Sequence, residues 1–597
     1  MAIFAGTAER ESGRRWALAV LLVAGCQVAG CQGVYESPGP TEPPITERFT
    51  DFECHEGMVG KDLPARRLSR IQHRNTVESV LSRFYDRGTV AGIMDSLAPQ
   101  LATRPVDQLV DHPSTPGQRL FGRSDQSLSE ELVRADLRIA EGVAAEMTAS
   151  DARIEAWAGA CATNGDPSDD AACLDAIVDT LGPLTHRRPL TDDERAFYRD
   201  EAYIDGDTIV VEGLRELVTV FFAQPSFVFH LEGEGPLNAY EAAARLSYHF
   251  WNSMPDDALM AAAEDGSLMT DEGWSTEVSR VLADPRAESS MRELLDEWLK
   301  LDRVVNLSGG TGAAYDMLRG DLVIDDALDR AVRDEVGELF VYLVRHGGTF
   351  RDFFLSDMTV TQSPELAALY GMTPSADGSP VAVPDERVGI LTRAGMLLPR
   401  SDITPPGPGP RTHPILRGVF VRRQIMCDVI NPPPAGAMNG LAPVDQATTS
   451  TRDGNEIITG SEFCGSCHHA LNAAGYALEE FDPLGRHRTM EQLFDPDGNP
   501  TIEVPVDASA QLVGIEGTID GGSELSARLY ETELPSACFS RHYVRFALGR
   551  PEDPRGAESC VLRSIDEAID EDRPLSEVLG LVVLDPAFRV RTLEVAP

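Results

Sequence analysis

The stretch DDALDRAVRDEVGELFVYLVRHGG, residues 325–348, shows the pattern that decides the fold class. Its apolar side chains recur at steps of three and four residues, which is the spacing of one face of an α-helix. Gly347 and Gly348 follow as a stop signal. We therefore predict a helix over 325–346 whose apolar face lies in the core. The residues of that face are Leu328, Val332, Val336, Leu339, Phe340 and Leu343.

The same helical spacing returns before this stretch. Residues 239–252 and 288–301 each place apolar side chains on one face, whereas only Thr501 to Val506 alternates as a short strand does. The chain has 597 residues, too many for one ordinary core, so we expect several packed modules. The sequence thus predicts a mainly α, multi-module helical protein with little β structure. Proline- and glycine-rich breaks lie near 372–384, 404–410 and 431–443.

The charge of the chain is strongly acidic. Fifty-two basic residues against 96 acidic ones leave a net charge of −44. Such a surface repels nucleic acid and anionic membranes, so we expect no nucleic-acid partner. It favours basic partners or dissolved cations, and it also simply keeps a protein soluble.

Residues 1–31 resemble the leader of a bacterial lipoprotein. Arginines precede the apolar run Trp16–Ala24, which is too short for a stable membrane span but suits a signal peptide. Val-Ala-Gly-Cys ends at Cys26 and recurs ending at Cys31, and this resembles the box in which a cysteine is acylated. We expect Cys26 to carry the lipid, with Cys31 as the alternative and a plain secretory peptide as the competing interpretation. The proline-rich residues 32–50 would form a tether, and lipid would be the only attachment to the membrane.

The sequence CGSCH at residues 464–468 has the clearest chemistry. Covalent haem attachment needs two thiols for the vinyl groups and an imidazole for the iron, and Cys464, Cys467 and His468 supply them. We predict one covalently bound haem c with His468 as the proximal iron ligand. Met490 is the first candidate for the distal ligand, and an open iron position is the alternative.

Other chemistry remains open at the same cysteines. A zinc site would need a second pair of cysteine or histidine ligands, and only His469 is adjacent. A thioredoxin-like redox pair would need a βαβ context, which the flanking sequence does not show. A plain disulfide between Cys464 and Cys467 is the structural alternative.

The remaining cysteines suggest disulfides in an oxidising compartment. If Cys31 carries the lipid, six cysteines remain for three disulfides, so parity favours Cys31, whereas the place directly after the apolar run favours Cys26. Cys161 and Cys173 are close in sequence and are the expected pair. Four cysteines have no predicted partner: Cys54, Cys427, Cys538 and Cys560.

Weaker motifs favour structural roles. Asp495-Pro496-Asp497-Gly498-Asn499 suggests a calcium loop, but Pro500 stands where that loop needs glycine, so we predict a tight turn. Thr191 with Glu194 predicts a helical capping box, and His249 is interpreted as a hydrogen-bonded core histidine. The chain lacks a nucleophile elbow, a phosphate-binding glycine loop and a zinc-protease helix motif, which argues against the commonest hydrolases and nucleotide enzymes.

Several segments together resemble a family of secreted multi-module proteins of planctomycetes and myxobacteria, which combine domains of unknown function with a planctomycete-type cytochrome c module. The resemblance covers residues 60–597 and implies haem binding and export, but no known reaction. One departure is Asn472-Ala473, where the family has Asp-Pro soon after the haem histidine. The matching motifs are Arg66-Arg67-Leu68-Ser69-Arg70 with Asn75-Thr76-Val77, Arg187-Arg188-Pro189-Leu190-Thr191, Ala244-Arg245-Leu246-Ser247-Tyr248 with Trp251-Asn252-Ser253-Met254-Pro255-Asp256, Pro414-Ile415-Leu416-Arg417-Gly418, Gly475-Tyr476-Ala477-Leu478-Glu479, and Ala547-Leu548-Gly549-Arg550.

These patterns divide the chain into seven expected segments. They are a leader at 1–31, a tether at 32–50, an N-terminal helical module at 51–128, a helical module with the Arg-Arg-Pro-Leu-Thr signature at 129–235, a central helical module at 236–371, a cytochrome-c-like haem module at 385–490 and a C-terminal helical module at 491–597.

The first functional hypothesis is electron transfer by an exported haem lipoprotein with a redox partner protein that is basic. It places the protein in the periplasm or at the cell surface, anchored to the outer membrane. A haem-dependent oxidoreductase acting on a small molecule or polymer is the second hypothesis, and a scaffold or binding lipoprotein with a structural haem is the third. The sequence does not decide whether the protein is an enzyme.

Overall fold

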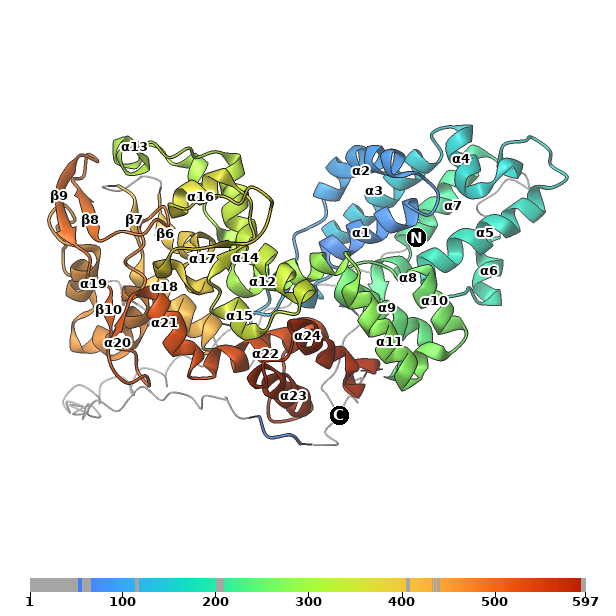
Figure 1. Ribbon diagram of the computed structural model, residues 1–597. Helices are drawn as coiled ribbons and strands as arrows, with labels where there is room; N and C mark the ends of the chain where they lie inside the picture. Colours follow the sequence, from blue (N-terminus) through green and yellow to red (C-terminus); the bar gives the residue numbers. More distant parts are fainter. Residues whose placement is uncertain are drawn as a thin grey trace, which may run out of the picture. The chain divides into compact units, whose positions relative to one another are not determined.

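The computed structural model describes residues 52–591 except 56–65, 113–117, 200–208, 404–408, 432, 434–435 and 437–440. The predicted leader and tether, with Cys26 and Cys31, lie outside the described residues. Helices make up most of the described chain, and the strands form two-stranded ribbons (Figure 1). The structure therefore confirms a mainly α fold with little β structure.

The stretch that opened the sequence analysis forms one long helix, α14 (Asp326–His346). Asp325 caps its start by accepting hydrogen bonds from the amides of Ala327 and Leu328, and Gly347 ends it in a left-handed conformation with φ 74°. The predicted apolar face is buried. The two neighbouring predictions are also confirmed, as α9 (Ala239–Trp251) and α12 (Ala287–Leu299).

The helices before α9 enclose a core of their own. Their buried side chains form one apolar cluster, which Tyr248 and Met254 join from α9 and the loop after it. Thr191 and Glu194 make both hydrogen bonds of the predicted capping box at the start of α6. The helices are α1 (Arg70–Leu81), α2 (Arg87–Ala102), α3 (Glu130–Met147), α4 (Asp151–Ala158), α5 (Asp170–His186), α6 (Asp192–Tyr198), α7 (Val211–Ala223) and α8 (Pro225–Val228).

A second, larger core draws on segments far apart in the chain. It includes side chains from Phe52 to Phe588, so the predicted central, haem and C-terminal modules share one apolar interior. Buried tryptophans join them: the Trp274 indole donates to the Val583 carbonyl at 2.8 Å and the Trp298 indole to the Gln424 carbonyl at 2.7 Å. The middle helices are α10 (Asp257–Glu264), α11 (Asp271–Ala283), α13 (Ala313–Arg319), α15 (Phe350–Phe354) and α16 (Pro364–Tyr370).

The last third of the chain carries the predicted haem motif and closes the core. A π-helical turn, Val421–Ile425, extends α18. The helices are α17 (Ala394–Leu397), α18 (Pro414–Phe420), α19 (Thr451–Thr459), α20 (Glu462–Tyr476), α21 (Gly521–Tyr530), α22 (Leu534–Leu548), α23 (Ser559–Asp570) and α24 (Leu575–Leu584).

The longest ribbon pairs β8 (Met490–Phe494) with β9 (Pro500–Pro505), which confirms the predicted strand. Asp495 turns the chain between them, because its Oδ1 accepts hydrogen bonds from the amides of Asp497 and Asn499. The predicted tight turn is therefore confirmed. The short antiparallel pairs are β1 (Arg66–Arg67) with β2 (Phe229–His230), β3 (Gly235–Pro236) with β12 (Val590–Arg591), β4 (Met358–Thr359) with β5 (Val381–Ala382), β6 (Ser401–Asp402) with β7 (Arg411–Thr412), and β10 (Ser509–Ala510) with β11 (Ile519–Asp520).

Three disulfides cross-link the described chain. Cys161 bonds to Cys173, the pair that closeness in sequence favoured. The other two close long loops, which restricts the unfolded chain, and their partners were not predictable from spacing. No helix among the described residues is both long and apolar enough to cross a bilayer. The long-range pairs are Cys54–Cys560 and Cys427–Cys538.

Candidate haem-attachment site

The CGSCH motif occupies the first turns of α20. Ser461 caps this helix, and its hydroxyl accepts a hydrogen bond from the Cys464 amide at 3.2 Å. Cys467 and His468 follow Cys464 by three and four positions, so the two thiols and the imidazole lie on one side of the helix. The helical conformation that haem attachment favours is present.

Both thiols of the motif are free. Cys464 is half-buried and Cys467 is exposed, and they are not joined to each other. All other described cysteines are in disulfides. The structure therefore does not contain a disulfide between Cys464 and Cys467, which was the structural alternative. Two accessible thiols one helical turn apart are what two thioether bonds require.

A chain of hydrogen bonds fixes the orientation of His468. The Thr459 hydroxyl donates to the Asn455 carbonyl at 2.7 Å, so its oxygen accepts from Asn472 Nδ2 at 3.0 Å. Asn472 therefore presents Oδ1 to His468 Nδ1, 3.2 Å away, and that nitrogen must donate. The lone pair then lies on His468 Nε2, the nitrogen that can bind a metal.

Asn472 has a role that the sequence did not indicate. Asn472-Ala473 stands where the resembling family has Asp-Pro. In the structure α20 continues through both residues to Tyr476. Asn472 was not predicted as a partner of His468, although their spacing of four residues on a helix was the available signal.

Two glycines bring α18 unusually close to α20. A Cβ atom on Gly418 would lie 1.7 Å from the Leu471 carbonyl oxygen, and one on Gly475 would lie 1.8 Å from that of Pro414. No other residue fits at either position without moving a helix. This contact holds the helix that carries the motif.

A buried ion pair supports the same contact. Arg417 Nη1 lies 3.0 Å from Glu479 Oε1, and both side chains are almost fully buried. The same Arg417 nitrogen donates to the carbonyls of Leu478 and Phe481. Two of the sequence motifs, around Arg417-Gly418 and Gly475 to Glu479, are thus explained by contact with each other.

Apolar side chains near the motif face solvent. Phe463, next to Cys464, is 68% exposed, and Ile457 on α19 is 51% exposed. A flat apolar cofactor bound to the free thiols would cover these exposed apolar side chains. The donor set, its helical spacing and these side chains therefore fit a covalent haem.

The predicted distal ligand lies at the start of β8. Met490 is 42% exposed and lines a hollow of about 320 Å³ together with Arg486 and His487. None of the three motif residues lines that hollow. Met490 as the sixth ligand stays a prediction. His487 lies between two carboxylates, 3.8 Å from Glu386 and 3.7 Å from Glu480.

The zinc alternative finds no further ligands at the motif. Among the described residues, potential metal-binding atoms converge only at Cys427, Cys538 and His542. The two cysteines of that group are joined in a disulfide, so they offer no thiolate.

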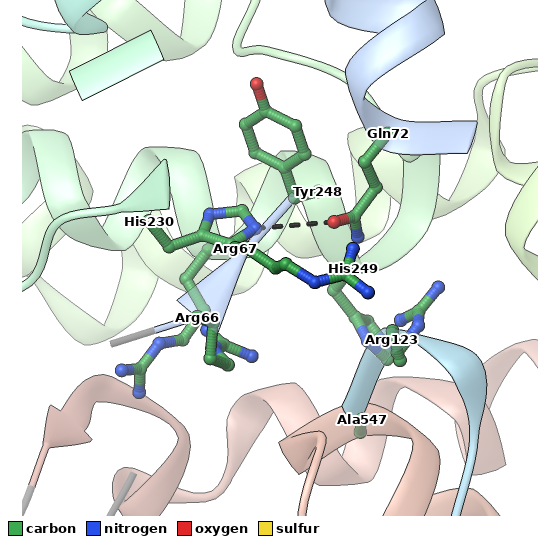
Figure 2. Close-up of a pocket in the computed structure, with 9 residues that line it drawn as sticks. Arg66, Arg67, Gln72, Arg123, His230, Tyr248, His249 and Ala547 are labelled. Carbon is green, nitrogen blue, oxygen red and sulfur yellow. Dashed lines mark hydrogen bonds between the residues drawn. The ribbon is translucent and has the colours of Figure 1, made fainter. Parts of the chain in front are cut away.

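A second set of sequence motifs meets in a small internal cavity (Figure 2). Arg66 and Arg67 reach it from β1, Arg245 and His249 from α9, and Ala547 from α22. The cavity measures about 20 Å³, room for roughly one water molecule. Motifs from the two ends and the middle of the chain thus line the same space.

The arginines of this cavity are all paired with carboxylates. We call Arg66, Arg67, Arg123 and Arg245 the arginine junction. Burial would raise the pKa of Glu232, but the charges of Arg66 and Arg245 outweigh it and lower that pKa strongly. His249 donates to the Tyr543 hydroxyl at 3.1 Å, as the interpretation of a core histidine predicted. The ion pairs are Arg66–Glu232, Arg245–Glu232, Arg67–Asp107, Arg67–Asp125 and Arg123–Glu293.

Comparison with known families matches two segments of the chain. Residues 237–372 match PSD4, a protein of unknown function (DUF1592), and residues 387–491, which include the CGSCH motif, match PSCyt3, a protein of unknown function (DUF1588). No curated protein and no solved structure matches the chain. The two matches support the resemblance to a multi-domain family with planctomycete-type cytochrome c modules, and the name PSCyt3 suggests a cytochrome c-type module.

Proposed function

We propose that this chain is an exported, lipid-anchored c-type haem protein that transfers single electrons. One observation carries the proposal. Cys464 and Cys467 are free and accessible on one helical turn next to His468, while every other described cysteine is in a disulfide. This is the donor set for thioether-bound haem.

Each residue of the motif would have its own role in holding the haem. Cys464 and Cys467 would each add a thiol across one vinyl group, and His468 would offer the Nε2 lone pair to the iron. Asn472 would hold the imidazole by accepting a hydrogen bond from Nδ1–H, which leaves the lone pair on Nε2 for the iron. Haem c supplies reversible one-electron chemistry when it is bound.

Electron transfer is favoured over catalysis by the exposure of the motif. Cys467 and Phe463 are exposed. The hollows of about 160 and 320 Å³ in the same part of the described chain are lined by other residues. The residues that would hold the haem therefore lie at the surface, where a partner protein can reach them, rather than around an enclosed substrate cavity. The net charge of −44 would favour a basic redox partner.

Export is supported by the cysteine usage. Three disulfides are typical of an oxidising compartment such as the periplasm. They occupy six of the ten cysteines, and besides Cys464 and Cys467 of the motif they leave Cys26 and Cys31. If Cys26 carried the lipid, Cys31 would stay in the mature chain as an unpaired thiol, so the pairing strengthens the case for Cys31. Mass spectrometry of the mature N-terminal peptide would decide between them.

The test is haem that stays with the denatured chain. The full chain is expressed with c-type haem maturation proteins, and a denaturing gel is stained for haem. We expect staining in the parent chain and in Ser466→Ala, a matched control inside the motif, and none in the double variant Cys464→Ala/Cys467→Ala. Absence of covalent haem in the parent chain would overturn the proposal.

The absorption spectrum of the same protein tests the assigned role. A low-spin, six-coordinate spectrum supports electron transfer, and its loss in Met490→Leu would identify Met490 as the distal ligand. A high-spin spectrum in the parent chain would favour the haem-enzyme hypothesis instead.

A further inference from the structure

A hollow of about 350 Å³ lies beside the π-helical turn that follows α18. Its apolar wall is made by Leu416, Val419 and Phe420. The rest of its lining is strongly cationic, although the chain as a whole has a net charge of −44. We call this site the cationic hollow. Its basic side chains are Arg119, Lys300, Arg303, Arg400 and Arg423.

Arg400 is buried there without a carboxylate. Its side chain is 7% exposed, and its guanidinium carbon lies 3.6 Å from the centre of the Phe420 ring. Nη1 donates to the Met396 carbonyl at 2.8 Å, and no ion pair with Arg400 occurs among the described residues. Burial and the nearby charges of Arg303 and Arg417 lower the pKa of Arg400 to about 9, although the charge of Asp302 acts in the opposite direction.

Two further cations of the hollow bond only to backbone carbonyls in the described chain. Lys300 Nζ donates to the Glu297 carbonyl at 2.6 Å, and burial lowers the pKa of Lys300 to about 8. Arg423 donates to the Ile430 carbonyl at 3.1 Å, and its buried Nε has no partner among the described residues. Glu297 and Asp302 raise the pKa of Lys300 against the effect of burial, whereas Arg423 has no carboxylate partner among the described residues.

The hollow contains little negative charge of its own. Asp111 is the one carboxylate that lines it, and its side chain is 84% exposed, 3.4 Å from Arg119. Most other buried arginines of the described chain have close carboxylates, as Arg545 has with Glu552 at 2.6 Å, although Arg187 and Arg387 have none and bond to backbone carbonyls. An uncompensated buried charge is costly, and five cations that share one lining carboxylate point to an anion from outside the chain.

We propose that the cationic hollow binds a small oxyanion with at least two negative charges, a polycarboxylate or a phosphate. The volume of about 350 Å³ is that of a small-molecule site. Guanidinium groups bind carboxylate and phosphate oxygens through paired hydrogen bonds. Phe420 and Leu416 offer apolar contact to the carbon part of an organic anion. This inference does not depend on haem.

Isothermal titration calorimetry of the full chain with citrate and with inorganic phosphate tests the site. Sodium chloride keeps the ionic strength constant. Arg303 is exposed and has no ion pair among the described residues, so Arg303→Gln removes charge without breaking a described contact. We expect it to weaken binding by about tenfold. The matched control Arg134→Gln removes an exposed charge on α3 and should change nothing.

The ratio of the two affinities identifies the source of the anion. Tighter citrate binding supports an organic polycarboxylate, and tighter phosphate binding supports a phosphate compound. If neither anion binds beyond the effect of chloride, or if Arg134→Gln weakens binding as much as Arg303→Gln does, the proposal is overturned.

Arg400→Met gives a second, independent readout. Methionine keeps contact with Phe420 and removes the unpaired charge, so the melting temperature without citrate should not fall. The rise in melting temperature that citrate gives the parent chain should be lost. A variant that melts lower without citrate and keeps the full rise would show a structural arginine and overturn the proposal.

Discussion

The arginine junction and the exposed side of α20 differ in whether their polar side chains have partners within the chain. In the junction four buried guanidinium groups each meet a carboxylate, within 3.2 Å for the longest pair, Arg66–Glu232. On α20 the Cys464 thiol and the Nε2 atom of His468 have no hydrogen-bond partner among the described residues, and the Cys467 sulfur accepts only a long hydrogen bond of 3.9 Å from the Ser466 hydroxyl. The same chain thus gives every guanidinium group of one set an opposite charge, although the Nε atoms of Arg66, Arg67 and Arg123 have no hydrogen-bond partner, and it leaves the groups on α20 without strong partners.

This difference separates residues that hold the fold from residues that await a ligand. Breaking a buried pair leaves a charge in a medium of low polarity, which lowers the stability of the folded state. Removing a free, accessible thiol takes nothing from the folded chain without haem. Pairing therefore says more about the role of a residue than its place in a sequence motif does.

The largest effect is expected in the arginine junction. Arg123 Nη2 lies 2.6 Å from Glu293 Oε2, with the side chains 5% and 10% exposed. Arg123→Met leaves the nearly buried Glu293 carboxylate without a positive charge and with only the hydrogen bond from the Asn252 amide, so we expect a loss of about 3–5 kcal/mol in the free energy of unfolding. Urea denaturation of the haem-free chain measures it. Cys464→Ala is the matched control from the free set, with an expected change of about 0.5 kcal/mol or less. Equal losses of stability in Arg123→Met and Cys464→Ala would contradict the difference between the arginine junction and α20.

A smaller effect is expected from acid in the same junction. Arg66 and Arg245 hold the pKa of Glu232 well below its ordinary value of 4.5, against the effect of burial. A lowered carboxyl pKa stabilises the fold fully above pH 4.5 and progressively less as the pH falls below it. Glu232→Gln should therefore flatten the dependence of stability on pH between about 5 and 3. Urea titrations at several pH values measure this, and parallel curves for variant and parent would contradict the assigned ion pairs.

The sequence predicted the local structure better than the long-range contacts. The spacing in 325–346, the capping box at Thr191 and the turn at Asp495 depend on neighbouring residues, and all three were predicted correctly. The pairing of Cys54 with Cys560 depends on how the whole chain folds, and spacing carries no information about it. The hydrogen bond from His468 to Asn472 is intermediate between these two cases. The two residues are close in sequence, but the orientation of the Asn472 amide depends on Thr459 from the preceding helix.

The smallest expected effect concerns the hydrogen bond that orients His468, the proposed iron ligand, on α20. Asn472→Leu removes the acceptor of the His468 Nδ1 proton, a hydrogen bond worth about 0.5–1.5 kcal/mol. Haem should still attach, because the thiols are unchanged, but a less basic imidazole stabilises ferric iron less. We expect the midpoint potential to rise by about 20–65 mV, measured by spectroelectrochemical titration. Thr459→Ser keeps the hydroxyl that orients Asn472 and should leave the potential unchanged. If Asn472→Leu also leaves the midpoint potential unchanged, the hydrogen bond to His468 has only a structural role in α20. The helix would then offer the iron nothing beyond the residues of the CGSCH motif.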